Sequence, residues 1–456
     1  MTPSCAATCA RTRRRTNGQG NDPAVCVVRC WRGPRHGALA LRRRIPGGCL
    51  ARRPNETPMK LHGLHIPAAL RGFAAGAAQV FDITLRGDKV ATIEPSAVQA
   101  PARGILLSAL VEAHAHIDKN YTVQEVGAAQ GNLFAAIERM DQHRAGWSAA
   151  ALRQRMERAL HEAWRSGTRA LRTHIDWVQP EPPAALALFE ALRDEWRGRI
   201  ELQFVSLTPL DLFTDLAAGA RIAREVRRAA GVLGAFVYRN HGIAGKLGRL
   251  FDLAQQHGLG LDLHVDEGLD PDACGLRSIA ELVHARHFRQ GVVCGHCCSL
   301  ALQDEAVADA TLVLCAQAGI HIVALPTTNL YLQGAWERTP VPRGITRIRE
   351  AAARGLRASL ATDNVQDAFY PYGSYDLLET FGLGVQLAHL APAIEWLDAI
   401  TISPAKALGL AWDGRIAPGC PADLVLLEAS AEHELIGARG RRRSVIRAGQ
   451  ILEPTP

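Results

Sequence analysis

Short apolar runs recur through the middle of the chain and alternate with longer amphipathic stretches. Such runs are typical of buried strands, and apolar residues at every third or fourth position are typical of helices. Eight runs with helical stretches between them predict a (β/α)8 barrel of the TIM type, whose working residues lie at the C-terminal strand ends. The predicted strands are Ile105–His116, Arg169–His174, Ile200–Leu207, Gly231–Tyr238, Leu259–His264, Gly291–His296, Gly319–Leu325 and Ala358–Asp363. Predicted helices include Ala149–Ser166, Ala184–Trp196 and Phe213–Ala230.

Shorter β segments flank this region on both sides. Phe81–Leu85 and Lys89–Ile93 predict two strands around a turn, and Ala422–Leu427 predicts a strand near the C-terminus. Two more short runs follow, joined by a tight turn at Ala448–Gly449. We therefore expect an α/β protein in which residues 105–405 form the barrel, and residues 59–104 and 406–456 together form a small β-sandwich.

The positive charge of the chain is confined to its first 58 residues. The whole chain carries +7, but residues 1–58 hold twelve Arg, no Lys, and only Asp22 and Glu56 as acids. That segment therefore carries +10 and the remainder −3. It shows neither strand nor helix periodicity, so we expect a basic, disordered extension and no nucleic-acid partner for the body of the protein.

The composition excludes several other classes of protein. An apolar fraction of 48% and a charged fraction of 21% are typical of globular proteins. No run of eighteen apolar residues exists, so neither a membrane span nor a membrane partner is expected. Nothing else suggests secretion, so the eleven cysteines do not predict a disulfide framework, and we expect a cytoplasmic protein. The oligomeric state stays open, a homo-oligomer included.

Polar residues that can bind metals or carry protons stand at the ends of four predicted strands. The first strand ends in His114 and His116, whose imidazoles share one side because side chains alternate with period two. The fifth strand ends in His264, with Glu267 three residues beyond, and the sixth ends in His296. The eighth ends in Asp363. All of these positions lie where a barrel presents its active site.

The residue types suit metal-assisted hydrolysis. Three neutral imidazoles and one carboxylate bind Zn²⁺ or Fe²⁺ and leave a position for water, whose pKa the ion lowers toward neutrality. A carboxylate such as Glu267 can carry protons between that water and a leaving nitrogen. His296 can orient the water or stabilise a developing oxyanion.

The ordered motifs resemble the amidohydrolase superfamily, and more closely its cytosine deaminase branch, over roughly residues 59–456. The segments that carry the resemblance are His114–Asp118, Leu171–Asp176, His264–Glu267, Gly295–His296, Leu325–Gly334, Arg343–Thr346 and Asp363–Pro371.

The resemblance implies one metal ion, Zn²⁺ or Fe²⁺. It implies that His114, His116, His264 and Asp363 bind this ion, and that Glu267, His296 and Asp363 are catalytic, with Glu267 as proton shuttle and His296 beside the attacking water. Binuclear relatives carry a bridging Lys at the end of strand four. The corresponding segment, Ala235–Arg239, has none, which implies a mononuclear site.

Several positions depart from the cytosine deaminases and leave the substrate open. Pro209 or Leu210 stands where they carry a Gln, Asn364 replaces a second Asp, and Phe369 replaces a Trp. The lysine at position 119, directly after Asp118, makes this segment more similar to that of the triazine-side-chain aminohydrolases. The candidate substrate-binding residues are Asn364, Phe369, Pro209 and Trp336.

For other polar residues we expect supporting roles. His174 is predicted to be a supporting or structural residue rather than a substrate contact, and Asp118 to orient the His pair. Cys294, Cys297 and Cys298 are expected to be buried thiols, since no second Cys pair completes a zinc site. The roles of Asn329 and Gln333 stay open between substrate contact and a place in loop structure.

The sequence therefore favours a metal-dependent hydrolytic deaminase that acts on a small nitrogen heterocycle, such as cytosine, and releases ammonia. An s-triazine (N-alkylammelide-type) aminohydrolase or a cyclic-amide hydrolase is the alternative. A non-catalytic barrel used for binding is a more remote one, and the intact Glu267 argues against it.

Overall fold

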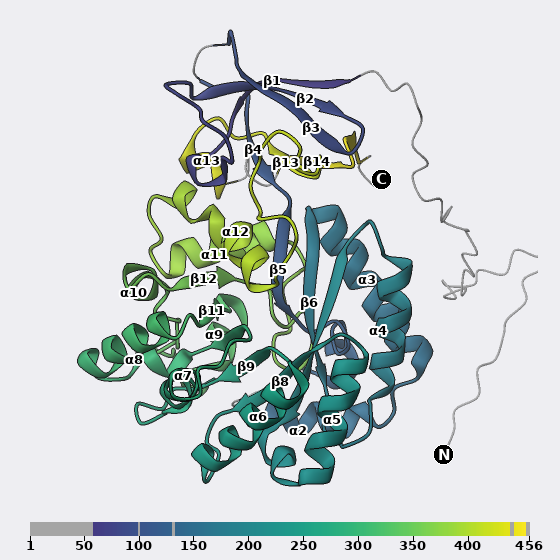
Figure 1. Cartoon of the computed structure of the whole chain (residues 1–456), viewed down its shortest axis with the longest axis vertical. Helices are drawn as coiled ribbons and strands as arrows, with labels where there is room; N and C mark the ends of the chain where they lie inside the picture. Colours follow the sequence, from purple (N-terminus) through teal and green to yellow (C-terminus); the bar gives the residue numbers. More distant parts are fainter. Residues whose placement is uncertain (1–57, 99–100, 130–132, 438–441, 453–456) are drawn as a thin grey trace, which may run out of the picture. The chain divides into compact units, whose positions relative to one another are not determined.

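The computed structural model describes residues 58–98, 101–129, 133–437 and 442–452 (Figure 1). The extension predicted at the N-terminus therefore lies outside the described residues, apart from Pro58. Within these ranges the strands form two sheets, one of eight strands and one of seven. No helix in this part of the chain combines the length and the apolar character that crossing a bilayer requires.

The eight-stranded sheet is parallel throughout and follows the order of the sequence, as predicted for the barrel. Its ends meet at an isolated parallel bridge between Ala115 and Asp363, where the Asp363 N–H donates to the His114 carbonyl at 2.9 Å. The strands are β5 Leu110–Ala115, β6 Thr168–Asp176, β7 Glu201–Pro209, β8 Val232–Val237, β9 Leu261–Val265, β10 Val292–His296, β11 His321–Ala324 and β12 Arg357–Leu360.

Amphipathic helices follow the strands and surround the sheet (Figure 1). In α5, Ala218, Ile222 and Val226 recur every four residues and are buried, and the Asp215 carboxylate caps the first turn. The helices between strands are α3 Ala149–Ser166, α4 Ala184–Glu195, α5 Leu216–Arg228, α6 Ile243–His257, α7 Gly275–Ala285, α8 Glu305–Gln317, α10 Ile348–Ala353 and α11 Leu377–Leu387. Additional helices are α1 Val123–Val126, α2 Leu133–Arg144, α9 Pro326–Leu332, α12 Ile402–Ala407 and α13 Glu432–Leu435, with 3₁₀ turns Ala68–Leu70, Leu210–Thr214, Cys298–Ala301 and Ala393–Ile400.

The first predicted strand is in fact two strands. Gly104–Ser108 (β4) belongs to the seven-stranded sheet, and β5 begins the barrel after a break at Ala109. Both halves are buried on both faces, so the sequence shows one continuous apolar run with no alternation that would reveal the break.

The segments before and after the barrel pair with one another, as predicted. Their seven strands form one sheet with a shared hydrophobic core, in which Phe81 and Ile83 pack with Leu424 and Ile446. The predicted turn at Ala448–Gly449 has φ of 48° and 77°, the left-handed pair that a two-residue hairpin needs. The predicted domain boundaries stay a prediction. The strands are β1 Met59–His65, β2 Val80–Arg86, β3 Lys89–Pro95, β4, β13 Leu424–Leu427, β14 Arg443–Arg447 and β15 Gln450–Ile451.

Two glycines test the packing of the barrel. A Cβ on Gly234 in β8 would lie 2.7 Å from the Ser206 carbonyl and 2.9 Å from the Asp262 carbonyl, whereas Gly245 in α6 has open space. We expect Gly234→Ala to lower the free energy of unfolding by about 1–3 kcal/mol through overpacking. Gly245→Ala, the matched control, should raise it by about 0.5–1 kcal/mol. Urea denaturation measures both, and a Gly234→Ala variant as stable as wild type would contradict this packing.

Candidate metal centre and active site

Four polar side chains that the sequence predicts at three strand ends lie close together at the point where the barrel closes. His114 is on β5, His116 follows it, His264 is on β9, and Asp363 follows β12. His116 Nε2 lies 3.2 Å from Asp363 Oδ1, and His114 Nε2 lies 3.5 Å from the same oxygen. His264 Nε2 is 3.3 Å from His116 Nε2. All four side chains are buried.

The described residues leave several polar atoms of this cluster without hydrogen-bond partners. They include His114 Nε2 and both carboxylate oxygens of Asp363. The facing nitrogens of His116 and His264 satisfy each other only if one of them carries a proton and donates it to the other, and the Nδ1 atoms of both rings have no partner among the described residues. Buried groups in this condition are costly unless a ligand satisfies them. Donor atoms 3.2–3.5 Å apart suit a tetrahedral ion with bonds of about 2.0–2.2 Å.

Burial also sets the protonation states that a metal requires. It lowers the pKa of His116 to about 3 and the pKa of His264 well below its usual value, so both rings are neutral ligands at pH 7. Burial alone would raise the pKa of Asp363, but the close side chains of His114 and His116 outweigh this effect and hold that pKa well below its usual range. The cluster therefore offers neutral imidazoles and an ionised carboxylate.

Glu112 ties together the two chain segments that carry these ligands. Its buried carboxyl accepts the His114 N–H at 3.0 Å and the Thr362 N–H at 3.2 and 3.3 Å, just before Asp363. Burial raises its pKa to about 8. Sequence reasoning missed this residue, although its spacing of two from His114 places both on one face of the strand.

A buried ion-pair network supports His114 from the side of β6. The His174 ring lies 3.9 Å from the His114 ring, centroid to centroid, and His174 Nε2 contacts Asp262 Oδ1 at 3.2 Å. Arg172 Nη1 donates to the second Asp262 oxygen at 2.8 Å. His174 therefore packs beneath the cluster, which is where a supporting residue would lie. Asp118 also lies beside the cluster and accepts the Asp176 N–H at 3.2 Å.

Glu267 and His296 face each other beside the four side chains. Glu267 Oε1 lies 3.4 Å from His296 Nδ1, and the Asn329 amide donates to that nitrogen at 2.9 Å. Nδ1 accepts this hydrogen bond, so the neutral ring carries its proton on Nε2, which has no partner among the described residues. Burial and then the negative charge of Asp363 raise the pKa of Glu267 well above its usual value. The role of Asn329, which the sequence left open, is thus to orient the His296 ring.

Two of the candidate substrate-binding residues lie in the loop that follows Asp363. Asn364 is buried and donates to Asp367 at 2.7 Å. The Phe369 ring is buried under the Lys119 ammonium, whose Nζ lies 4.9 Å from its centroid. Lys119 is itself buried and donates to Asp176 at 2.8 Å.

The other two candidates lie farther toward the surface. Pro209 ends β7 and is exposed. Trp336 packs on Tyr331, with ring centroids 5.2 Å apart, and is 37% exposed. Neither contributes to the cavity beside Glu267, although Ala335 does.

A cavity of about 610 Å³ opens from Glu267 to the surface. Its walls come from the start of α2, from Tyr238 and Arg239 after β8, from residues 267–269, and from residues 332–342 after β11. Of the residues at or beside the cluster, Glu267 is the one that lines this cavity.

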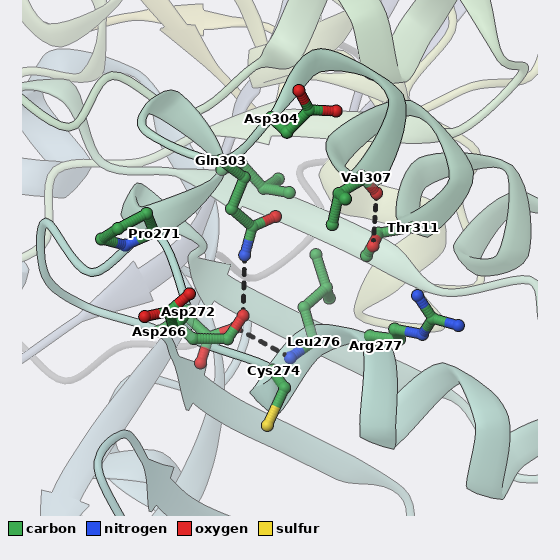
Figure 2. Close-up of a pocket in the computed structure, with 12 residues that line it drawn as sticks. Asp266, Pro271, Asp272, Cys274, Leu276, Arg277, Gln303, Asp304, Val307 and Thr311 are labelled. Carbon is green, nitrogen blue, oxygen red and sulfur yellow. Dashed lines mark hydrogen bonds between the residues drawn. The ribbon is translucent and has the colours of Figure 1, made fainter.

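A separate cavity of about 410 Å³ lies between α7 and α8 (Figure 2). Asp266 is buried there and caps α7 by accepting the Gly275 and Leu276 N–H groups at 3.1 and 2.9 Å, while Gln303 donates to the Ala273 carbonyl at 2.7 Å. These contacts fix the loop that presents Glu267. The six described cysteines are free, and the predicted buried thiols Cys294, Cys297 and Cys298 belong to no metal-binding group among the described residues.

Comparisons with known proteins agree with this geometry. A model described as "Amidohydrolase family" matches residues 121–452. A pterin deaminase of Rhizobium rhizogenes is 37% identical over 415 residues, 88% of this chain and 95% of that protein. An N-isopropylammelide isopropyl amidohydrolase of Pseudomonas sp. is 23% identical over 390 residues, 82% of this chain and 93% of that protein. The crystal structure of 5-methylcytosine deaminase from Klebsiella pneumoniae with phosphonocytosine matches with a TM-score of 0.76 at 28% identity, covering 87% of this chain and 98% of that one.

The position of Glu112 generates a testable prediction. Glu112→Ala should weaken divalent-metal affinity about 10- to 100-fold, because the backbone positions of His114 and Asp363 lose a shared anchor. Glu112→Gln keeps an acceptor oxygen and should stay within about threefold of wild type, a smaller loss than removing the acceptor. Metal retained after dialysis against graded chelator measures this, with Glu201→Ala, an exposed glutamate on β7, as the control. Equal loss in the Ala and Gln variants, or none in either, would refute the anchoring role.

Proposed function

The chain belongs to the amidohydrolase family, and we propose that it is a metal-dependent deaminase that hydrolyses an exocyclic C–N bond of a nitrogen heterocycle and releases ammonia. The observation that carries the proposal is the buried cluster of three imidazoles and the Asp363 carboxylate beside Glu267, at the end of an open cavity. Enzymes of this family hydrolyse carbon–nitrogen bonds, as the names of the relatives indicate.

The unpartnered donor atoms fit one divalent ion, Zn²⁺ or Fe²⁺, held by His114, His116, His264 and Asp363. When bound, such an ion supplies the Lewis acidity that brings the pKa of a water molecule close to neutrality. The segment at the end of strand four, Ala235–Arg239, contains no lysine, which supports a mononuclear site.

Glu267 moves the protons. Its carboxyl is buried at the inner end of the cavity, within reach of both the water and a substrate ring nitrogen. It accepts one proton from the attacking water and delivers it to a ring nitrogen of the heterocycle. It then takes the second proton from the same oxygen and delivers it to the departing amine, so that ammonia leaves as the carbon–oxygen double bond forms. A carboxyl whose pKa is raised by burial is suited to hold that proton between the two transfers.

His296 stabilises the oxygen that becomes negatively charged. The Asn329 amide fixes the ring so that its Nε2–H is free to donate toward the water or the developing oxyanion. The backbone of His296 is held at a φ of 65°, a left-handed conformation that is costly for a side-chain-bearing residue and is common at functional sites.

A pterin is the substrate class that the observations favour. The pterin deaminase of Rhizobium rhizogenes is 37% identical over 88% of this chain, and the positions that depart from the cytosine deaminases, such as Asn364 and Phe369, lie in the loop beside Asp363. The cavity continues outward past an aromatic pair, Phe134 and Tyr238, which offers a second ring of the substrate an apolar surface.

An N-alkylammelide is the second candidate. The Pseudomonas sp. relative covers 82% of the chain, and N-isopropylammelide isopropylaminohydrolase from Burkholderia multivorans matches with a TM-score of 0.69 at 27% identity, covering 87% of this chain and 98% of that one. The product would then be an alkylamine instead of ammonia. Cytosine and isocytosine complete the set that distinguishes these substrates.

The direct test is product release from these substrates by the metal-loaded protein. We expect ammonia from pterin, and expect Glu267→Gln to lower kcat by about 10²–10⁴-fold, because it removes the proton carrier. Metal content should be unchanged, since Glu267 is not among the donor atoms. Glu281→Gln, an exposed glutamate of α7, is the matched control. No amine from any substrate, or full turnover by the Glu267→Gln variant, would overturn the proposal and leave a barrel used for binding.

A further inference from the structure

Two arginines stand at the outer end of the cavity that begins at Glu267. Arg239 follows β8, and Arg338 lies in the segment after α9. Among the lining residues that the structure describes, Glu267 is the one carboxyl, and it is 4% exposed at the inner end. The outer end of the cavity therefore carries two guanidinium groups, each with one carboxylate at a longer distance, Asp270 and Glu337.

Arg239 is held close to the catalytic loop. The Tyr238 hydroxyl lies against Gly268, where a Cβ would be only 2.0 Å from it, so the end of β8 directly contacts the residue after Glu267. Arg239 has a φ of 56°, which turns the chain sharply at the cavity, and its Cζ lies 5.1 Å from the Tyr238 ring centroid. Asp270 approaches Arg239 Nε at 3.6 Å, longer than a hydrogen bond, and so does not occupy the guanidinium fork.

Arg338 approaches from a loop fixed at both ends. Arg343 Nε donates to the Leu330 carbonyl at 3.0 Å and so joins the two ends of this loop. Within the loop, Gln333 Nε2 contacts the Glu267 carbonyl at 3.5 Å. The Arg338 side chain is 78% exposed, and its acidic neighbour Glu337 lies 4.0 Å away. Arg338 therefore lines the cavity while its side chain stays mostly in solvent, with Glu337 as a distant ion-pair partner.

Two aromatic rings line the same cavity as the arginines and Glu267. The rings of Phe134 and Tyr238 are nearly parallel, at 13°, with centroids 6.2 Å apart. Phe134 is 43% exposed, so part of its ring is open to a ligand in the cavity. A fused heterocycle with its reacting carbon at Glu267 would extend along this surface toward Arg239 and Arg338.

We propose that Arg239 and Arg338 bind a carboxylate carried by the substrate at the end of the ring system opposite the amino group that is removed. Guanidinium groups pair with carboxylates through two parallel hydrogen bonds, which gives both orientation and affinity. The preferred substrate is then an anionic aminoheterocycle, for a pterin one with a carboxylate at ring position 6. This proposal rests on the deaminase function proposed above.

The test compares pterin-6-carboxylate with 6-hydroxymethylpterin, which is similar in size and uncharged. We expect wild type to show a kcat/KM at least about tenfold higher for the carboxylate, and expect Arg239→Gln and Arg338→Gln each to reduce that preference about tenfold, mainly through KM. Arg197 is an exposed arginine at the opposite end of the strands, and Arg197→Gln should leave kcat/KM unchanged for both substrates.

Quenching of pterin fluorescence measures binding separately from turnover. Tighter binding of the carboxylate that depends on both arginines, without ammonia release, would support the arginine site and contradict the proposed reaction. Equal binding of the two pterins, or an equal loss for both substrates in the Arg239→Gln and Arg338→Gln variants, would overturn the arginine site and leave the reaction standing.

Discussion

Buried nitrogen and oxygen atoms that lack hydrogen-bond partners where the barrel closes are the constraint on which the rest of this structure depends. His116 and His264 face each other through ring nitrogens 3.3 Å apart, and Asp363 Oδ1 lies 3.2 Å from His116. Burial keeps His116 and His264 neutral, and the carboxylate stays ionised because its imidazole neighbours stabilise it. Burying such a cluster without a ligand costs free energy, whereas a cation between the donor atoms would offset that cost. The chemistry of the site follows from this affinity for a cation.

The surrounding fold serves to hold that cluster in place. The first and last barrel strands are joined by a single bridge, and the Glu112 carboxyl adds side-chain hydrogen bonds across the same closure. Beneath it, Asp262 is paired with Arg172 and His174, which keeps a polar layer in the barrel interior satisfied. A residue that fixes the backbone of the segments carrying His114 and Asp363 would act on a bound metal without touching it. The same organisation leaves the cavity side free for substrate.

Much of the fold and of the cluster could be predicted from the sequence because both depend on local pattern. Alternation of apolar runs with helical stretches predicts the barrel, and strand ends with His or Asp predict which residues meet. The break at Ala109 could not be predicted, since the strands on both sides of it are buried on both faces and the run has no alternation. Glu112 and Asp262 were missed although each lies two residues before a cluster histidine, which period-two spacing would have shown. The surroundings of Trp336 and Pro209 depend on loop conformation, which short-range pattern does not determine.

The central claim is that one divalent ion binds among His114, His116, His264 and Asp363. A crystal of the full chain, grown after incubation with zinc and measured at the zinc absorption edge, tests it most directly. The account predicts one anomalous peak per chain within about 2.0–2.2 Å of the three imidazole nitrogens and an Asp363 oxygen. A map with no peak at these residues, with two ions there, or with the ion bound elsewhere in the barrel would contradict it.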